Sequence, residues 1–140
     1  SRVRLLAFVN IAEGGMVVID VPNEFNVFQT TANAEYHLNE WWVNPPVHIN
    51  YFTPASLSHL LDICGYKIAN IVSSFPMELF LLFGQQYVGN SELGKNCHNQ
   101  RVLFEKTLIR HGKEDTLLEF YRALAKLEIG RQITVYAYKK

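Results

Sequence analysis

Cysteine is scarce in this sequence, where only Cys64 and Cys97 occur among 140 residues. A disulfide framework, such as small secreted domains use, needs more cysteines than these two distant ones. Isolated thiols are typical of proteins in a reducing compartment. We therefore expect two free cysteines and a cytoplasmic location.

The sequence also lacks an excess of charge of either sign and a long hydrophobic run. Thirteen basic and thirteen acidic side chains cancel, so no basic field favours nucleic acid or an anionic membrane surface. Polar residues and Pro76 interrupt the most apolar segment, residues 68–83, which predicts neither a membrane span nor a signal peptide. We expect a soluble chain with no nucleic-acid or membrane partner, and its length and 49% hydrophobic content are typical of one domain.

An apolar run near the start of the chain is the first feature that points to a site. Residues 16–21 (MVVIDV) follow Gly14 and Gly15, and Pro22 stops the run. The absence of alternation predicts a strand buried on both faces, as in a parallel sheet covered by helices. In open parallel sheets ligands bind at the carboxyl ends of the strands, where residues 23–26 (NEFN) follow here.

Capping residues and hydrophobic spacing predict a mixed α/β chain. Thr53 and Pro54 begin the clearest helix, which Gly65 ends. In the last strand apolar residues alternate with polar or aromatic ones, so one of its faces is expected to be buried. The order strand, helix, strand between residues 16 and 73 implies a parallel crossover. The predicted helices are 3–11, 26–38, 53–65, 77–83, 91–112 and 114–129, and the predicted strands are 16–21, 66–73 and 131–140.

Several blocks of residues together resemble one enzyme family. They are residues 14–26 (GGMVVIDVPNEFN), 41–57 (WWVNPPVHINYFTPASL), 60–66 (LLDICGY), 75–84 (FPMELFLLFG), 87–90 (YVGN) and 120–124 (FYRAL). These blocks are similar to the carboxyl-terminal half of a class I S-adenosylmethionine-dependent methyltransferase, and they cover nearly the whole chain. The Pro-Asn-acid-Phe-Asn and Pro-Pro-x-His-x-Asn-Tyr-Phe blocks are the most specific.

The resemblance implies the carboxyl-terminal part of a Rossmann-like sheet with three strands. Residues 16–21 would be its fifth strand and 66–73 its sixth, with residues 131–138 as a seventh, antiparallel strand inserted between them. Residues 76–129 would be a helical insertion before that last strand, and an insertion of this size is commonly functional. We thus expect residues 1–140 to form a single, partial domain.

The resemblance stops at the cofactor. The family holds S-adenosylmethionine with a glycine-rich turn after its first strand, whereas Gly14 and Gly15 precede a strand. We therefore expect S-adenosylmethionine in the full-length enzyme, no tight binding to this fragment, and no activity of the fragment alone. The methyl acceptor is expected to be a small molecule that the sequence does not identify.

Candidate site residues come from the two specific blocks. His48, in a rigid aromatic loop, is a candidate general base, and the alternative is a histidine that fixes the loop through a hydrogen bond. Asn23, Glu24, Phe25 and Tyr51 are candidate substrate-binding residues. The alternative for the polar ones, and for the flanking Asn26, which could also contact cofactor or substrate, is that they cap the next helix, and both roles could hold at once. The alternative for the aromatic ones, with Trp42, is that they belong to the core.

Other polar residues predict no further site. Cys97 and His98 are adjacent and face different directions on a helix, and His59 and His111 stand alone, so we expect no metal site. Three cationic residues of the predicted helix 91–112 are interpreted as a solvated face: Arg101, Lys106 and Arg110.

A second class of function also fits the sequence. Without a neighbouring fourth strand, residues 16–21 would expose a long apolar edge, which another chain or the first helix should cover. The alternative to an enzyme is therefore a non-catalytic module that self-associates, for example as a dimer, through this edge.

Overall fold

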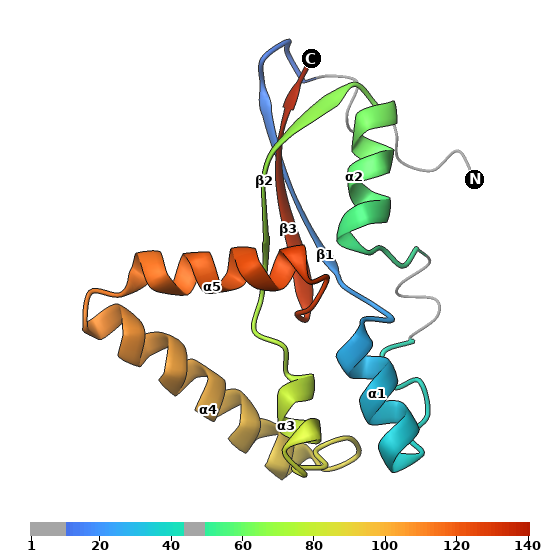
Figure 1. Cartoon of the computed structure of the whole chain (residues 1–140), viewed down its shortest axis with the longest axis vertical. Helices are drawn as coiled ribbons and strands as arrows, with labels where there is room; N and C mark the ends of the chain where they lie inside the picture. The colour runs from blue at the N-terminus through green and yellow to red at the C-terminus, as the bar shows by residue number, and fades with distance from the viewer. Residues whose placement is uncertain (1–10, 44–49) are drawn as a thin grey trace.

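The computed structural model describes residues 11–43 and 50–140, which form a mixed α/β structure (Figure 1). The elements are β1 (Met16–Pro22), α1 (Val27–Tyr36), α2 (Pro54–Ile63), β2 (Tyr66–Ser73), α3 (Glu78–Leu82), α4 (Ser91–Arg110), α5 (Glu114–Lys126) and β3 (Gln132–Lys139). All the helices and strands predicted within the described residues are confirmed. The helix predicted at residues 3–11 lies almost entirely outside them.

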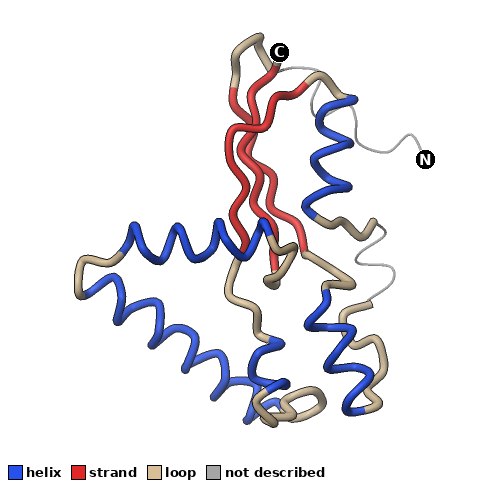
Figure 2. Tube along the Cα trace, in the orientation of Figure 1, coloured by secondary structure: helices blue, strands red, loops and turns tan. Residues whose placement is uncertain are grey.

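The three strands form an open sheet in the order β1-β3-β2 (Figure 2). β3 is antiparallel to both neighbours, so β1 and β2 run in the same direction on either side of it. The predicted insertion of the last strand, antiparallel, between the other two is confirmed. The carboxyl ends of β1 and β2 consequently meet the start of β3 at one edge, toward α1 and α3 (Figure 1).

One face of the sheet forms the core with α2. Ile133, Val135 and Ala137 of β3 are fully buried and pack with Leu57 and Leu61 of α2. Their alternation with partly exposed residues confirms the predicted single buried face of the last strand. Thr53 caps α2 through a hydrogen bond from the Ser56 backbone, and Pro54 fills the first helical position, as predicted.

β1 is not buried on both faces, and this prediction is wrong. Met16 and Val18 are 54% and 51% exposed, whereas Val17 and Ile19 pack against the core. The physical reason is that, among the described residues, β1 is an edge strand and α2 covers only the face that carries Val17 and Ile19. A parallel direction relative to β2 therefore did not bring helices to both faces of β1.

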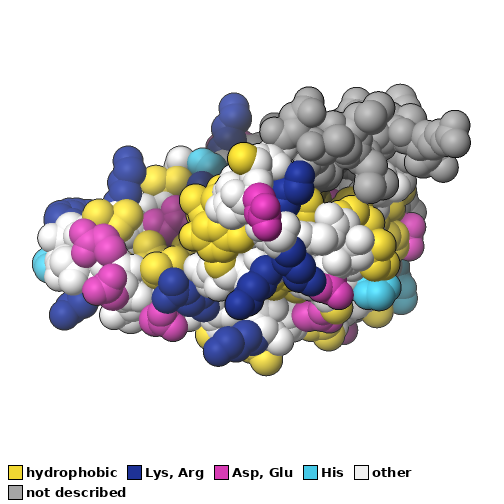
Figure 3. Space-filling view, turned by 90° about the horizontal axis from the view of Figure 1, so that it is seen from above, with side chains coloured by type: hydrophobic (Ala, Val, Ile, Leu, Met, Phe, Trp, Pro, Cys, Tyr) yellow, Lys and Arg dark blue, Asp and Glu magenta, His cyan; other side chains and the backbone are white. Residues whose placement is uncertain are grey.

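The segment between β2 and β3 is helical, as predicted for the insertion at residues 76–129. α5 packs on β2, α4 packs on α5, and α3 packs on α1. α4 and α5 extend to one side of the sheet as two arms joined by a short turn (Figure 1). Basic and acidic side chains are interspersed on the face of the molecule seen in Figure 3, with hydrophobic groups between them.

Candidate functional site at the carboxyl edge of the sheet

The structure brings together four of the predicted site residues just beyond β1. Asn23 forms an isolated parallel β-bridge with Phe52, and the ring centroids of Phe25 and Tyr51 lie 5.6 Å apart. Glu24 lies between Asn23 and Phe25 and is buried. His48, the candidate base, lies outside the described residues. Asn23, Glu24, Phe25 and Tyr51 thus form one local group, the Phe25 cluster. Their role in binding a substrate stays a prediction.

Asn23 has a structural task in this cluster. Its side chain is 1% exposed and its Nδ2 donates to the carbonyl oxygens of Glu128 at 2.9 Å and Gly130 at 3.1 Å. Its backbone N–H donates to Arg131 O at 3.0 Å. Asn23 therefore fastens the end of β1 to the turn that precedes β3.

The polar residues around Asn23 organise the start of α1. Asn26 caps this helix by accepting hydrogen bonds from the backbone N–H groups of Phe28 and Gln29. The Glu24 carboxylate accepts a hydrogen bond of 2.9 Å from Gln29 Nε2. Helix capping, the alternative to substrate contact, is thus confirmed for Asn26.

The aromatic residues of the cluster present one ring to solvent. Phe25 is 45% exposed, and its backbone has a positive φ of 60°. The centroid of its ring lies 5.6 Å from the ring centroids of both Trp42 and Tyr51, in edge-to-face geometry. Trp42 is buried. The core alternative therefore holds for Trp42, while Phe25 has a face available for a ligand.

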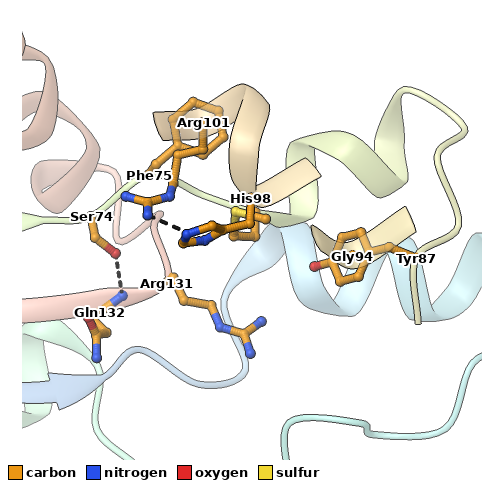
Figure 4. Close-up of a pocket in the computed structure, with 9 residues that line it drawn as sticks. Ser74, Phe75, Tyr87, Gly94, His98, Arg101, Arg131 and Gln132 are labelled. Carbon is orange, nitrogen blue, oxygen red and sulfur yellow. Dashed lines mark hydrogen bonds between the residues drawn. The ribbon is translucent and has the colours of Figure 1, made fainter. Parts of the chain in front are cut away.

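A cavity that the sequence did not predict lies at the same edge of the sheet (Figure 4). Its volume is about 410 Å³. Six of its lining residues carry polar side chains, three from the strand ends and three from the helical segment: Ser74, Arg131, Gln132, Tyr87, His98 and Arg101.

Arg131 is positioned in this cavity by an ion pair. Its Nη1 lies 3.2 Å from Glu78 Oε1, and the Glu78 side chain is fully buried whereas that of Arg131 is 42% exposed. A buried carboxylate requires such a partner because desolvation of an unpaired charge is costly. Glu78 therefore holds the guanidinium through Nη1. The other N–H groups of Arg131 are not used by this ion pair.

His98 and Arg101 belong to a second polar network on α4. Arg101 Nη1 donates to both oxygens of Glu105, at 2.8 and 2.9 Å, and Tyr121 donates to Glu105 at 2.5 Å. Arg101 Nη2 also lies 3.4 Å from His98 Nδ1. Because a guanidinium only donates, this contact makes Nδ1 the acceptor and leaves the proton of a neutral His98 on Nε2.

The interpretation of three cations on α4 as a solvated face is wrong for one of them. Arg101 has a side chain only 24% exposed and lines the cavity, whereas Lys106 and Arg110 are exposed. The spacing of these residues along the helix gives no sign of this difference. It depends on the docking of α4 beside the ends of β2 and β3.

Tyr87 places a buried hydroxyl at the cavity. Its oxygen has no hydrogen-bond partner in the part of the chain that the structure describes. Burial, together with the negative charge of Glu78, raises the pKa of Tyr87 above its ordinary value, so the hydroxyl keeps its proton and remains a donor.

The residues at this edge do not fit S-adenosylmethionine in the way that the family binds it. Gly14 and Gly15 lie before β1, where Gly14 N donates to Lys139 O at 3.1 Å. The two glycines therefore lie at the opposite end of the strands from Asn23. The described residues thus place no glycine-rich turn at the candidate site.

Within residues 11–43 and 50–140 no three histidine, cysteine or acidic side chains gather closely enough to share a metal ion. In the same ranges none of the helices combines the length and apolar character needed to cross a membrane.

Comparison with family models, curated proteins and solved structures gives no match to this chain.

Proposed function

We propose that this chain is the carboxyl-terminal portion of a Rossmann-like class I S-adenosylmethionine-dependent methyltransferase and forms the substrate side of its cleft. The observation that carries the proposal is the strand order β1-β3-β2, with β3 antiparallel between two parallel strands. This is the order that the sequence resemblance implied for the fifth, seventh and sixth strands. The cofactor would be held by parts of the enzyme other than the residues described.

The proposed role of this portion is to position a small-molecule methyl acceptor. Methyl transfer is an in-line displacement, so the orientation of the acceptor is the main requirement. Phe25 and Tyr51 would contact the acceptor, with Asn23 and Glu24 beneath them. His48 would take a proton from the acceptor if its nucleophile must lose one.

A methyl-transfer assay on the full-length enzyme tests this role. With isotope-labelled S-adenosylmethionine, we expect His48→Ala to lower kcat with little change in KM, and Phe25→Ala to raise KM. His111→Ala, an exposed residue at the end of α4, is the matched control and should leave both unchanged. Unchanged turnover in His48→Ala would remove the base assignment, and absence of any methyl transfer would remove the proposal.

The chain on its own provides a second test. Because the cofactor turn is not found at the candidate site, calorimetry of residues 1–140 with S-adenosylmethionine should show no stoichiometric site of micromolar affinity. Detection of such a site would contradict the expectation that this portion does not bind the cofactor tightly.

The two free thiols, Cys64 and Cys97, support the cytoplasmic location proposed for the enzyme.

A second candidate function is self-association through β1. The outer edge of β1 pairs with no strand in the described part of the chain, and the Met16 and Val18 side chains on one face of this strand are about half exposed. Such edges template pairing with another chain. Sedimentation should then show a homo-oligomer that Val18→Lys dissociates and that Val27→Lys, at an equally exposed position of α1, leaves intact. A monomer at all concentrations would contradict this function.

A further inference from the structure

We infer that the cavity at the junction of β2, β3 and α4 binds the anionic group, carboxylate or phosphate, of a small molecule. Four of its polar lining residues are able to donate hydrogen bonds into one space: Ser74, Tyr87, His98 and Arg131 (Figure 4). They come from segments far apart in the sequence, and they meet only because the helical segment returns to the sheet edge.

The charges that line the cavity are positive. Arg101 and Arg131 are the charged side chains among the described residues that line it. Their acidic partners, Glu105 and Glu78, lie behind them and outside the lining. Arg131 uses Nη1 toward Glu78, so its other N–H groups are free to form the paired hydrogen bonds that carboxylates and phosphates accept.

Two of the neutral donors, Ser74 and His98, already accept one hydrogen bond each. Ser74 Oγ accepts a hydrogen bond of 3.0 Å from Gln132 N, which leaves its hydroxyl proton to donate. His98 Nδ1 faces Arg101 at 3.4 Å, which leaves Nε2–H to donate. A ligand that completes this set must therefore supply acceptors.

The Tyr87 hydroxyl is the most informative of the donors. A buried hydroxyl without a partner costs free energy, and such groups are found where a ligand or a water completes the site. In Figure 4 this hydroxyl is directed from the helical side toward the space between His98 and Arg131. An anion bound there would satisfy the hydroxyl and neutralise the exposed side of Arg131 together.

Binding of an anion does not depend on the proposed methyl transfer. The identification of this anion as the acidic group of the methyl acceptor does rest on that proposed function. The cavity and the Phe25 cluster share the turn at residues 128–131, which Asn23 holds, so one molecule with an anionic end and an apolar body would suit both.

Calorimetric titration of the whole chain with three probes tests the inference. Inorganic phosphate and benzoate represent the two anionic sources, and benzamide is the neutral counterpart of benzoate. We expect one of the anions to bind with saturation at millimolar concentrations or below, and benzamide to bind more weakly. Binding of phosphate alone would identify a phosphoryl group, and binding of benzoate alone a carboxylate.

Two variants locate the binding in the cavity. Tyr87→Phe removes only the unpartnered hydroxyl, and Arg131→Lys keeps a positive charge for Glu78 but loses the planar pair of donors. Each should weaken anion binding about tenfold, the loss expected for one hydrogen bond to a charged group. Tyr136→Phe on β3 is the matched control and should bind as the unchanged protein does.

Absence of saturable anion binding, or equal affinity in Tyr87→Phe, Arg131→Lys and the unchanged protein, would overturn the inference. Failure of the function proposal is distinguishable from this result. The enzyme could transfer no methyl group and still bind an anion that the variants bind more weakly. The assignment of the cavity as an anion site would then stand, and only the identification of the anion as part of a methyl acceptor would be removed.

Discussion

The side-chain amide of Asn23 donates a hydrogen bond of 3.1 Å to the carbonyl oxygen of Gly130, which lies 107 residues further along the chain. The same amide also donates to Glu128, whose backbone has a positive φ of 57°. Because Arg131 follows directly, this contact sets where its side chain begins. The Phe25 cluster and the donor-rich cavity are thus built on one shared piece of backbone.

Replacement of Asn23 by aspartate tests this connection. The two side chains have nearly the same shape, but a carboxylate has no N–H to donate to the two carbonyl oxygens. We expect Asn23→Asp to lower the free energy of unfolding by about 3 kcal/mol, since buried acceptors lose their donors and face a negative charge. Urea unfolding measures the change. Asn99→Asp, at an exposed position of α4, should stay within about 0.5 kcal/mol of the unchanged protein.

A methyl group at Gly130 has no room in this turn. Gly130 has φ of 119°, and an added Cβ would lie 1.9 Å from Ser73 Oγ and 2.5 Å from Ser74 O. We expect Gly130→Ala to lower the free energy of unfolding by about 3 kcal/mol, because the backbone oxygen of Ser74 cannot move aside easily. Gly94→Ala in α4 is the control. Nothing lies within 4 Å there, so helix propensity should raise the stability by up to about 1 kcal/mol. Equal effects at both glycines would contradict the tight turn.

Local sequence signals predicted the elements well because each signal acts over a few residues. Thr53 and Pro54 specify the start of α2 through one hydrogen bond and one fixed dihedral angle. The alternation of Ile133 and Val135 with polar residues directly reflects the pleat of β3. The exposed face of β1 escaped prediction because the exposure of Val18 depends on which helices cover the sheet, and the apolar run of β1 itself does not encode this.

The two parts of the candidate site differ in the same way. Asn23, Glu24 and Phe25 are consecutive, so a strand that ends at Pro22 was enough to place them at the sheet edge. At the cavity, Arg131 is held by Glu78, which lies 53 residues earlier in the chain, and Tyr87 and His98 join the lining from the helical segment. No spacing along the chain marks such a set, which forms only because the fold places α4 across the cavity from the ends of β2 and β3.

Removal of Arg131 should expose the dependence of Glu78 on its partner. Arg131→Met leaves a fully buried carboxylate without its cation, and we expect a loss of about 2–3 kcal/mol, reduced from the full buried-pair value because Arg131 is 42% exposed. Adding Glu78→Gln to this variant should recover part of the loss, since a neutral amide is cheaper to bury. Urea unfolding of the single and double variants gives the coupling, with Arg110→Met on the exposed face of α4 as the control. Simple additivity of the two substitutions would contradict the ion pair.

Two tyrosines should make the fold sensitive to alkaline pH. Burial raises the pKa of Tyr87, aided by the charge of Glu78, and burial also raises the pKa of Tyr121, which donates to Glu105. Both hydroxyls keep their protons in the folded chain at a pH where the unfolded chain, with an ordinary tyrosine pKa of about 10, has lost them. The unfolded state then binds fewer protons than the folded state, so stability is fully present below about pH 10 and falls as the pH rises further.

Tyrosinate absorbance and urea unfolding, followed together between neutral and strongly alkaline pH, measure this effect. Part of the absorbance change should appear only when the chain unfolds, because two of the seven tyrosines ionise late. Tyr87→Phe and Tyr121→Phe should each remove part of this delayed change and make stability fall less steeply with pH. If either substitution instead removed tyrosinate absorbance that develops while the protein is still folded, that tyrosine would ionise in contact with solvent. This result would contradict the burial of its hydroxyl. For Tyr87 this result would also take away the unpartnered donor on which the anion site depends.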